Sequence, residues 1–198
     1  DGGYIIAGHT NSFGSGGYDF WVIKLDAQGN RVWEKTFGGS NDDIENFIQQ
    51  TQDSGYIVSG RTKSYGAGGY DFWILKLDEF GNLLWEKTFG GSSDDEGGPI
   101  QQTQDGGYIV VGRTASFGAG SGDAWVIKLD PQGNQIWAKT FGGIGNECAT
   151  GVQQTSDGGY IISAWTSSFG AGNLDRWIFK LDSSGNLQWE QTFGGSDL

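Results

Sequence analysis

The sequence predicts an all-β protein, a β-propeller built from four 52-residue repeats of four strands each. One tyrosine recurs every 52 residues in the segments DGGYIIAG, DSGYIVSG, DGGYIVVG and DGGYIISA, at Tyr4, Tyr56, Tyr108 and Tyr160. A closing phrase, KTFGG or QTFGG, recurs in every copy, and no stretch has the apolar period of an amphipathic helix. We therefore expect one propeller domain over 1–198, with repeats 1–52, 53–104, 105–156 and 157–198. The propeller is either four-bladed or part of a larger one.

Each copy predicts four strands, which we call types a to d from the axis outward. In the second copy we expect type b at 55–62, type c at 71–77, type d at 82–89 and type a at 98–104. Types b and c are rich in β-branched and aromatic residues. Type a contains small residues, which suit the crowded strand next to the axis. Tryptophans on types c and d are expected between neighbouring blades, at Trp21, Trp33, Trp73, Trp85, Trp125, Trp137, Trp177 and Trp189.

The connections differ in length, which gives the disc two unlike faces. The a–b and c–d links are tight turns such as LDEFGN, typical of a type I turn with a glycine bulge. The b–c and d–a links are longer. Because connections alternate between strand ends in an antiparallel meander, all long loops fall on one face, the long-loop face, and the turns on the short-turn face. Binding residues concentrate on long loops, so we expect a site on the long-loop face.

Composition limits the partners. The net charge of −12 argues against nucleic acid, because phosphates are bound by Lys and Arg. A lone cysteine excludes an internal disulfide, and no apolar run reaches the roughly 18 residues that span a bilayer, so no membrane insertion is expected. The chain starts in mid-repeat and carries only three type-a strands. We interpret it as a mature fragment of an exported protein, with an incomplete first blade that could mediate homo-oligomerisation.

The segments KLDAQGNRVWEKTFGG and IQQTQDGGYIVVGRTASFGAG resemble repeats of bacterial and archaeal secreted or cell-surface β-propeller proteins. The resemblance covers all four copies and implies an extracellular or surface-attached protein. The c–d hairpin is also distantly similar to the tryptophan docking motif of quinoprotein dehydrogenases. It is one residue shorter and lacks the usual Thr before Gly, and no adjacent-cysteine site accompanies it.

One position differs among otherwise similar copies. At the end of strand b stand a histidine, two arginines and a tryptophan: His9, Arg61, Arg113 and Trp165. Trp offers a stacking platform and Arg forked hydrogen bonds, so the row predicts contacts to a ligand such as a glycan. The alternative is a set of solvent-exposed strand ends where any residue is tolerated.

Acidic residues form two groups. A first group enters strand c in every copy and is expected to hold the b–c loop through backbone hydrogen bonds, at Asp19, Asp71, Asp123 and Asp175. A second group lies in the d–a loops and provides oxygen ligands for Ca²⁺, at Asp42, Asp43, Asp94, Asp95, Glu96 and Glu147. Solvated acidic loops without metal are the alternative. Lysines inside strand c are expected to pair with a carboxylate such as the Asp that follows the strand, at Lys24, Lys76, Lys128 and Lys180.

No catalytic signature is present, and the chain has a single histidine. The leading interpretation is a non-enzymatic extracellular binding or adhesion module for a glycan, surface polymer or protein, without a required cofactor. The first alternative is a structural spacer or assembly subunit of a surface layer or filament. The second is a quinoprotein-like or hydrolytic enzyme.

Overall fold

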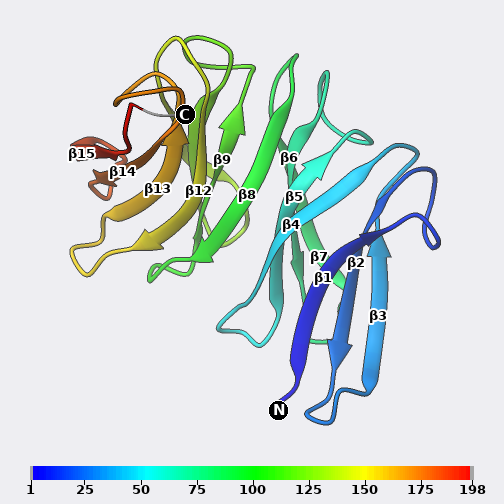
Figure 1. Ribbon diagram of the computed structural model, residues 1–198. Coiled ribbons are helices and arrows are strands. Elements are labelled where there is room, and N and C mark those ends of the chain that lie inside the picture. Colours follow the sequence, from blue (N-terminus) through cyan, green and yellow to red (C-terminus); the bar gives the residue numbers. More distant parts are fainter. Residues whose placement is uncertain (1, 197–198) are drawn as a thin grey trace.

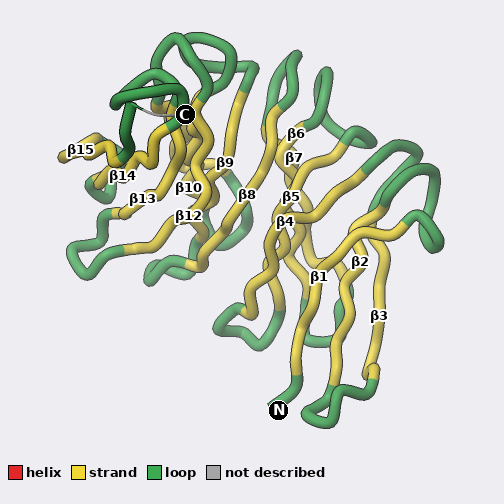
Figure 2. Tube along the Cα trace, in the orientation of Figure 1, coloured by secondary structure: helices red, strands yellow, loops and turns green. Residues whose placement is uncertain are grey.

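A computed structural model describes residues 2–196 as fifteen antiparallel β-strands without a helix (Figure 2). The strands form four sheets, the first with three strands and the others with four. The predicted all-β repeat architecture is therefore confirmed, and the first sheet contains no type-a strand among the described residues. Residues 2–196 also contain no helix that could cross a bilayer.

Each sheet is a meander in chain order. Sheet 1 consists of β1 (Tyr4–Thr10), β2 (Asp19–Leu25) and β3 (Arg31–Phe37). Sheet 2 consists of β4 (Asp43–Gln50), β5 (Tyr56–Thr62), β6 (Asp71–Leu77) and β7 (Leu83–Phe89). Sheet 3 consists of β8 (Asp95–Gln102), β9 (Tyr108–Thr114), β10 (Asp123–Leu129) and β11 (Gln135–Phe141). Sheet 4 consists of β12 (Glu147–Gln154), β13 (Tyr160–Thr166), β14 (Asp175–Leu181) and β15 (Leu187–Phe193).

The type-a strands β4, β8 and β12 are the inner strands, because successive ones contact each other. The predicted start of β8 at residue 98 was wrong, since the strand begins at Asp95. The pairing with β9 continues across a bulge between Gly97 and Ile100 and reaches the Asp95–Thr114 pair. A bulge of this kind hides the strand's alternating pattern, so the acidic residues before it resemble a loop.

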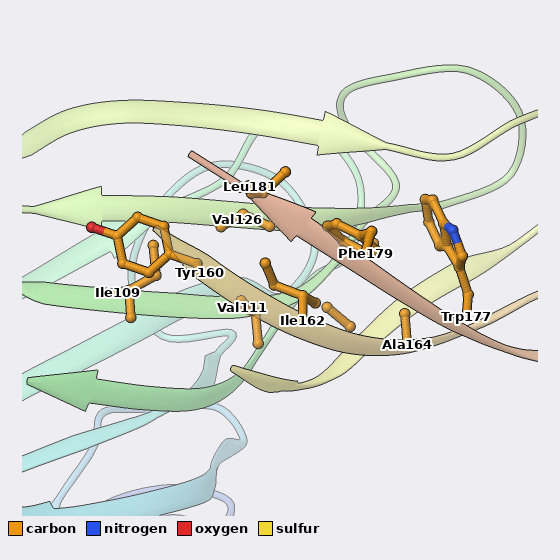
Figure 3. Close-up of a cluster of buried hydrophobic side chains, with 11 residues drawn as sticks. Ile109, Val111, Val126, Tyr160, Ile162, Ala164, Trp177, Phe179 and Leu181 are labelled. Atoms are coloured by element: carbon orange, nitrogen blue, oxygen red, sulfur yellow. The ribbon is translucent and has the colours of Figure 1, made fainter. Parts of the chain in front are cut away.

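The core lies between consecutive sheets. One cluster joins β9 and β10 of sheet 3 to β13 and β14 of sheet 4 (Figure 3). It contains Ile109, Val111, Val126, Tyr160, Ile162, Ala164, Trp177, Phe179 and Leu181. Equivalent clusters join sheet 1 to sheet 2 and sheet 2 to sheet 3. Sheets 2 and 3 therefore bury apolar side chains on both faces, and the stability of each sheet depends on its neighbours.

The four sheets lie side by side along an arc (Figure 1). Sheet 1 and sheet 4 are at opposite ends, and the described chain does not close into a ring. The b–c and d–a loops lie at one end of all strands, as the alternation of connections predicts.

Candidate functional site

A buried acid at the start of each inner strand ties that strand to the preceding sheet. Asp95 is inaccessible to solvent and accepts hydrogen bonds from the hydroxyls of Thr114 and Ser116, the latter at 2.6 Å. It also accepts the N–H of Gly91, at the end of the preceding sheet, at 2.8 Å. Asp43 makes the equivalent bonds in its own copy. Glu147 accepts the Thr166 hydroxyl and the backbone N–H groups of Gly143 and Ser168. We call this arrangement the inter-sheet clasp.

A second row of buried acids enters strand c, at Asp19, Asp71, Asp123 and Asp175. Asp71 Oδ2 accepts the backbone N–H of Ala67 in its own b–c loop at 2.6 Å, whereas Asp71 Oδ1 is buried without a hydrogen-bond partner. Gly90 lies between this carboxylate and the clasp: a Cβ there would collide with Asp71 Oδ1 and lie 2.8 Å from Asp95 Oδ2. The two carboxylates therefore converge across the sheet boundary.

This convergence changes the pKa of Asp71. Burial raises it, and the charge of Asp95 raises it further, against the lowering effect of the Ala67 N–H. Asp19 and Asp123 have raised pKa values for the same reasons, beside Asp43 and Glu147. The folded protein thus binds the Asp71 proton more tightly than the unfolded chain does.

Asp71→Asn should stabilise the protein at neutral pH. The pKa of Asp71 is raised on folding. The stability that Asp71 contributes to the folded state is therefore fully present below the unfolded pKa of 3.8 and is lost as the pH rises through the folded pKa. The amide removes this loss and can donate to Asp95, so we expect a higher melting temperature at pH 7 and no difference below about pH 3.5. Thermal unfolding across this pH range measures the effect. A lower melting temperature of the variant at pH 7 contradicts it.

The remaining acids of the predicted calcium group are engaged in protein contacts. Asp42 and Asp94 accept the backbone N–H groups of Tyr18 and Tyr70, at 3.0 and 2.9 Å. Glu96 forms an ion pair with a residue of the preceding sheet, Arg61, at 2.8 Å. Residues 2–196 contain no group of three or more His, Cys, Asp or Glu side chains placed to share a metal ion.

The variable row at the end of strand b lies at the boundaries between sheets. His9 contacts Glu45 of sheet 2 at 3.3 Å, and Arg61 stacks 4.6 Å from the centre of the Tyr70 ring while pairing with Glu96. Arg113 donates to Ser121 O at 3.0 Å and to Asn146 Oδ1 at 3.2 Å. These three side chains thus have partners within the protein.

Trp165, the fourth member of the row, lies in the last sheet. It lines a surface cavity of about 190 Å³ with Leu174, Asp175, Arg176 and Phe193. Of the four residues predicted to contact a ligand, Trp165 therefore lines this cavity, and the other three do not.

Two larger grooves lie on the short-turn face, opposite to the face that loop length favours. A groove of about 530 Å³ between sheets 2 and 3 is lined by Gln52, Asp53, Lys76, Leu84, Trp85, Gln102, Gly106, Tyr108, Pro131 and Gln132. A groove of about 440 Å³ between sheets 3 and 4 is lined by Gln104, Asp105, Lys128, Ile136, Trp137, Gln154, Gly158, Tyr160, Ser183 and Ser184. Every residue of the second groove stands 52 positions after its counterpart in the first.

The wall of each groove combines aromatic rings with a charged pair. In the first groove the rings of Trp85 and Tyr108 meet edge to face at 5.8 Å, and Leu84 is 57% exposed beside them. Lys76 Nζ lies 2.9 Å from Asp53 Oδ2. Lys76 thus pairs with a carboxylate, as predicted, but this carboxylate is not that of the Asp after the strand. The partner is the acid of the a–b turn, which the fold brings to the end of strand c.

The second groove repeats this charged pair. Burial alone would raise the pKa of Asp105, but hydrogen bonds from Thr103 and Lys128 outweigh it and lower the pKa to about 2. Burial, and then the charge of Asp53, raise the pKa of Tyr108 to about 12. At neutral pH the groove walls therefore contain a carboxylate and neutral phenols, together with a lysine side chain and glutamine amides. Such walls suit a polar ligand with an apolar face.

Comparison with known proteins gives one distant similarity. The chain is 24% identical over 206 aligned residues to the protein named Regulatory protein FlaEY of Caulobacter vibrioides. The alignment covers 86% of this chain and 22% of that protein. No protein-family model matches the chain. The chain is thus an all-β repeat protein that corresponds to about a fifth of its relative's length.

Proposed function

We propose that this protein is a non-enzymatic binding module of an exported or cell-surface protein, and that it recognises a glycan or similar surface polymer. The observation that carries the proposal is the pair of grooves at consecutive sheet boundaries. Each residue that lines one groove has a counterpart 52 positions later in the other. A polymer with a regular repeat can occupy both grooves at once, and linked sites raise the apparent affinity without new contacts. The resemblance to secreted and surface propeller repeats supports the location.

The aromatic walls favour a sugar ligand. Sugars bind through stacking of their apolar faces on aromatic rings and through hydrogen bonds to amides and charged groups. Trp85 and Trp137 supply the rings, and Gln132 and Ser184 stand at equivalent places on the rims. The long-loop row His9, Arg61, Arg113 and Trp165 is the competing proposed surface, centred on Trp165.

Filling the grooves should abolish binding. We expect Gln132→Trp combined with Ser184→Trp to weaken binding to surface polysaccharides at least tenfold, because both indoles occupy the groove mouths. Binding is measured on a glycan array and then by calorimetry with the strongest binder. Gln28→Trp is the matched control, since it places the same side chain in the corresponding turn of sheet 1, away from both grooves.

The two surfaces give different outcomes in this experiment. Loss of binding on Trp165→Ala, with the double tryptophan variant unaffected, would move the site to the long-loop face. The absence of any polysaccharide ligand would refute the proposed function itself.

We propose Ca²⁺ as an optional ligand of the paired acids, not as a requirement for the fold. The support is the buried, unpartnered Asp71 Oδ1 next to Asp95 Oδ2. Added Ca²⁺ would then raise the melting temperature of the natural chain and leave that of Asp71→Asn unchanged. An equal response of both proteins counts against this site.

A further inference from the structure

Three of the four sheets pair a tryptophan on strand c with a glutamate on strand d. The indole Nε1–H donates a hydrogen bond to the glutamate carboxylate, at 3.2, 3.1 and 3.0 Å. The pairs are Trp21–Glu34, Trp73–Glu86 and Trp177–Glu190. Each glutamate directly follows the tryptophan of strand d in the sequence, in the phrase WEKTF or WEQTF. The hydrogen bond therefore recurs with the 52-residue period.

Sheet 3 lacks the carboxylate of this pair. The corresponding phrase is WAKTF, so Ala138 of β11 stands where the other three sheets have glutamate. The strand-c tryptophan of sheet 3, Trp125, is only 5% exposed. Its indole N–H has no hydrogen-bond acceptor within residues 2–196. An indole N–H that the other copies satisfy with a carboxylate is thus left for an acceptor from outside.

A cavity of about 340 Å³ lies beside this indole. Its lining consists of Phe117, Trp125, Gln135, Ala138, Lys139 and Thr140. The ring centres of Phe117 and Trp125 are 5.3 Å apart, so aromatic surface forms one part of the wall. None of the six lining residues is acidic, in a chain whose net charge is −12. The surroundings of the indole therefore contain no negative charge that would repel an anion.

Lys139 provides a second hydrogen-bond donor at the cavity. Its Nζ donates to Asn186 Oδ1, in the c–d turn of sheet 4, at 2.7 Å. This contact holds the side chain in place, and one hydrogen bond does not exhaust the N–H donors of a lysine. A group bound in the cavity can therefore meet an indole N–H and a basic side chain together.

We propose that this cavity binds a small organic carboxylate with an aromatic or other apolar body. The ligand class follows from the other three sheets, where the group that meets the same indole is a carboxylate. The ligand carboxylate accepts hydrogen bonds from Trp125 and Lys139, and its apolar body lies against the Phe117 ring. The volume is that of a small-ligand site. The cavity shares no lining residue with either groove, so this inference does not rest on the proposed function.

A titration with benzoate, and with benzamide as its neutral counterpart, tests the proposal. The indole N–H signals are observed in ¹H–¹⁵N spectra, and Trp125→Phe assigns the signal of Trp125. We expect benzoate to shift this signal progressively to a plateau. Benzamide should bind roughly tenfold more weakly or worse, because a charged acceptor makes the stronger hydrogen bond.

Ala138→Glu is the decisive variant, since it restores the residue that the other three sheets carry and so fits the fold. Its own carboxylate takes the Trp125 N–H and fills the cavity, so benzoate should no longer shift the signal. Ile144→Glu is the matched control, because it adds the same charge at a residue that is 91% exposed and outside the cavity. It should leave the response to benzoate unchanged.

Three results would overturn the proposal. The first is a Trp125 signal that benzoate does not move in the natural chain. The second is an equal response to benzoate and benzamide. The third is a response to benzoate that survives Ala138→Glu.

Discussion

Replacing Asp95 by alanine should lower the free energy of unfolding by about 3 kcal/mol or more. The carboxylate is fully buried and accepts hydrogen bonds from Thr114, Ser116 and Gly91. Its removal leaves buried donors without an acceptor, and each such group costs roughly 1–3 kcal/mol. The substitution also removes the hydrogen bond from Gly91 that joins the end of sheet 2 to the start of sheet 3. Urea unfolding followed by tryptophan fluorescence measures the change.

The neighbouring residue provides the control for this prediction. Asp94 accepts a single backbone hydrogen bond, from Tyr70, and is exposed. Asp94→Ala should therefore cost no more than about 1 kcal/mol. If the two substitutions cost the same, the clasp does not hold the sheets together.

Trp137→Ala should cost about 3 kcal/mol, at the lower end of the range for large aromatic side chains, because the ring is only half-buried. The ring packs against Tyr160 and over Gly185, so its loss opens the boundary between sheets 3 and 4. Trp189, 52 residues later, lies on the last sheet of the described residues and is 48% exposed. Trp189→Ala should cost less than about 0.5 kcal/mol in the monomeric chain.

Chemical denaturation at a concentration where the chain is monomeric compares the two tryptophan variants directly. Both substitutions remove the same side chain from the same type of strand. Differences in strand propensity between Trp and Ala therefore affect both free energies of unfolding equally and cancel in the comparison. Equal costs would mean that the tryptophans stabilise their own sheets and not the boundaries.

The repeat period was sufficient to predict the strands, but not how the sheets pack against one another. The 52-residue period and the turn glycines place β5, β6 and β7 within one residue of their observed bounds. The start of β8 was missed because its bulge breaks the alternation that identifies a strand. The sequence left a closed four-bladed ring and a part of a larger propeller as two possibilities, since the angle between sheets depends on side-chain packing that no spacing in the sequence specifies.

The grooves were missed for a different reason. A binding role was predicted where the copies differ, at His9, Arg61, Arg113 and Trp165, and the constant residues were interpreted as architecture. Trp85 and Tyr108 are constant and come from two different copies, so their common groove exists only after the sheets pack. A signal was present in the sequence: Lys76 recurs in all four copies and Gln102 in three, at the same period as the aromatic residues.

The most direct test of the binding account is to see which tryptophans sense a ligand. The chain has nine tryptophans, and each indole N–H gives a signal in a ¹H–¹⁵N spectrum that a single Trp→Phe variant assigns. The chain is titrated with the polysaccharide fragment that binds most strongly on the array. We expect the signals of Trp85 and Trp137 to shift together while that of Trp165 stays in place. A shift confined to Trp165, or no shift at saturating ligand, would contradict it.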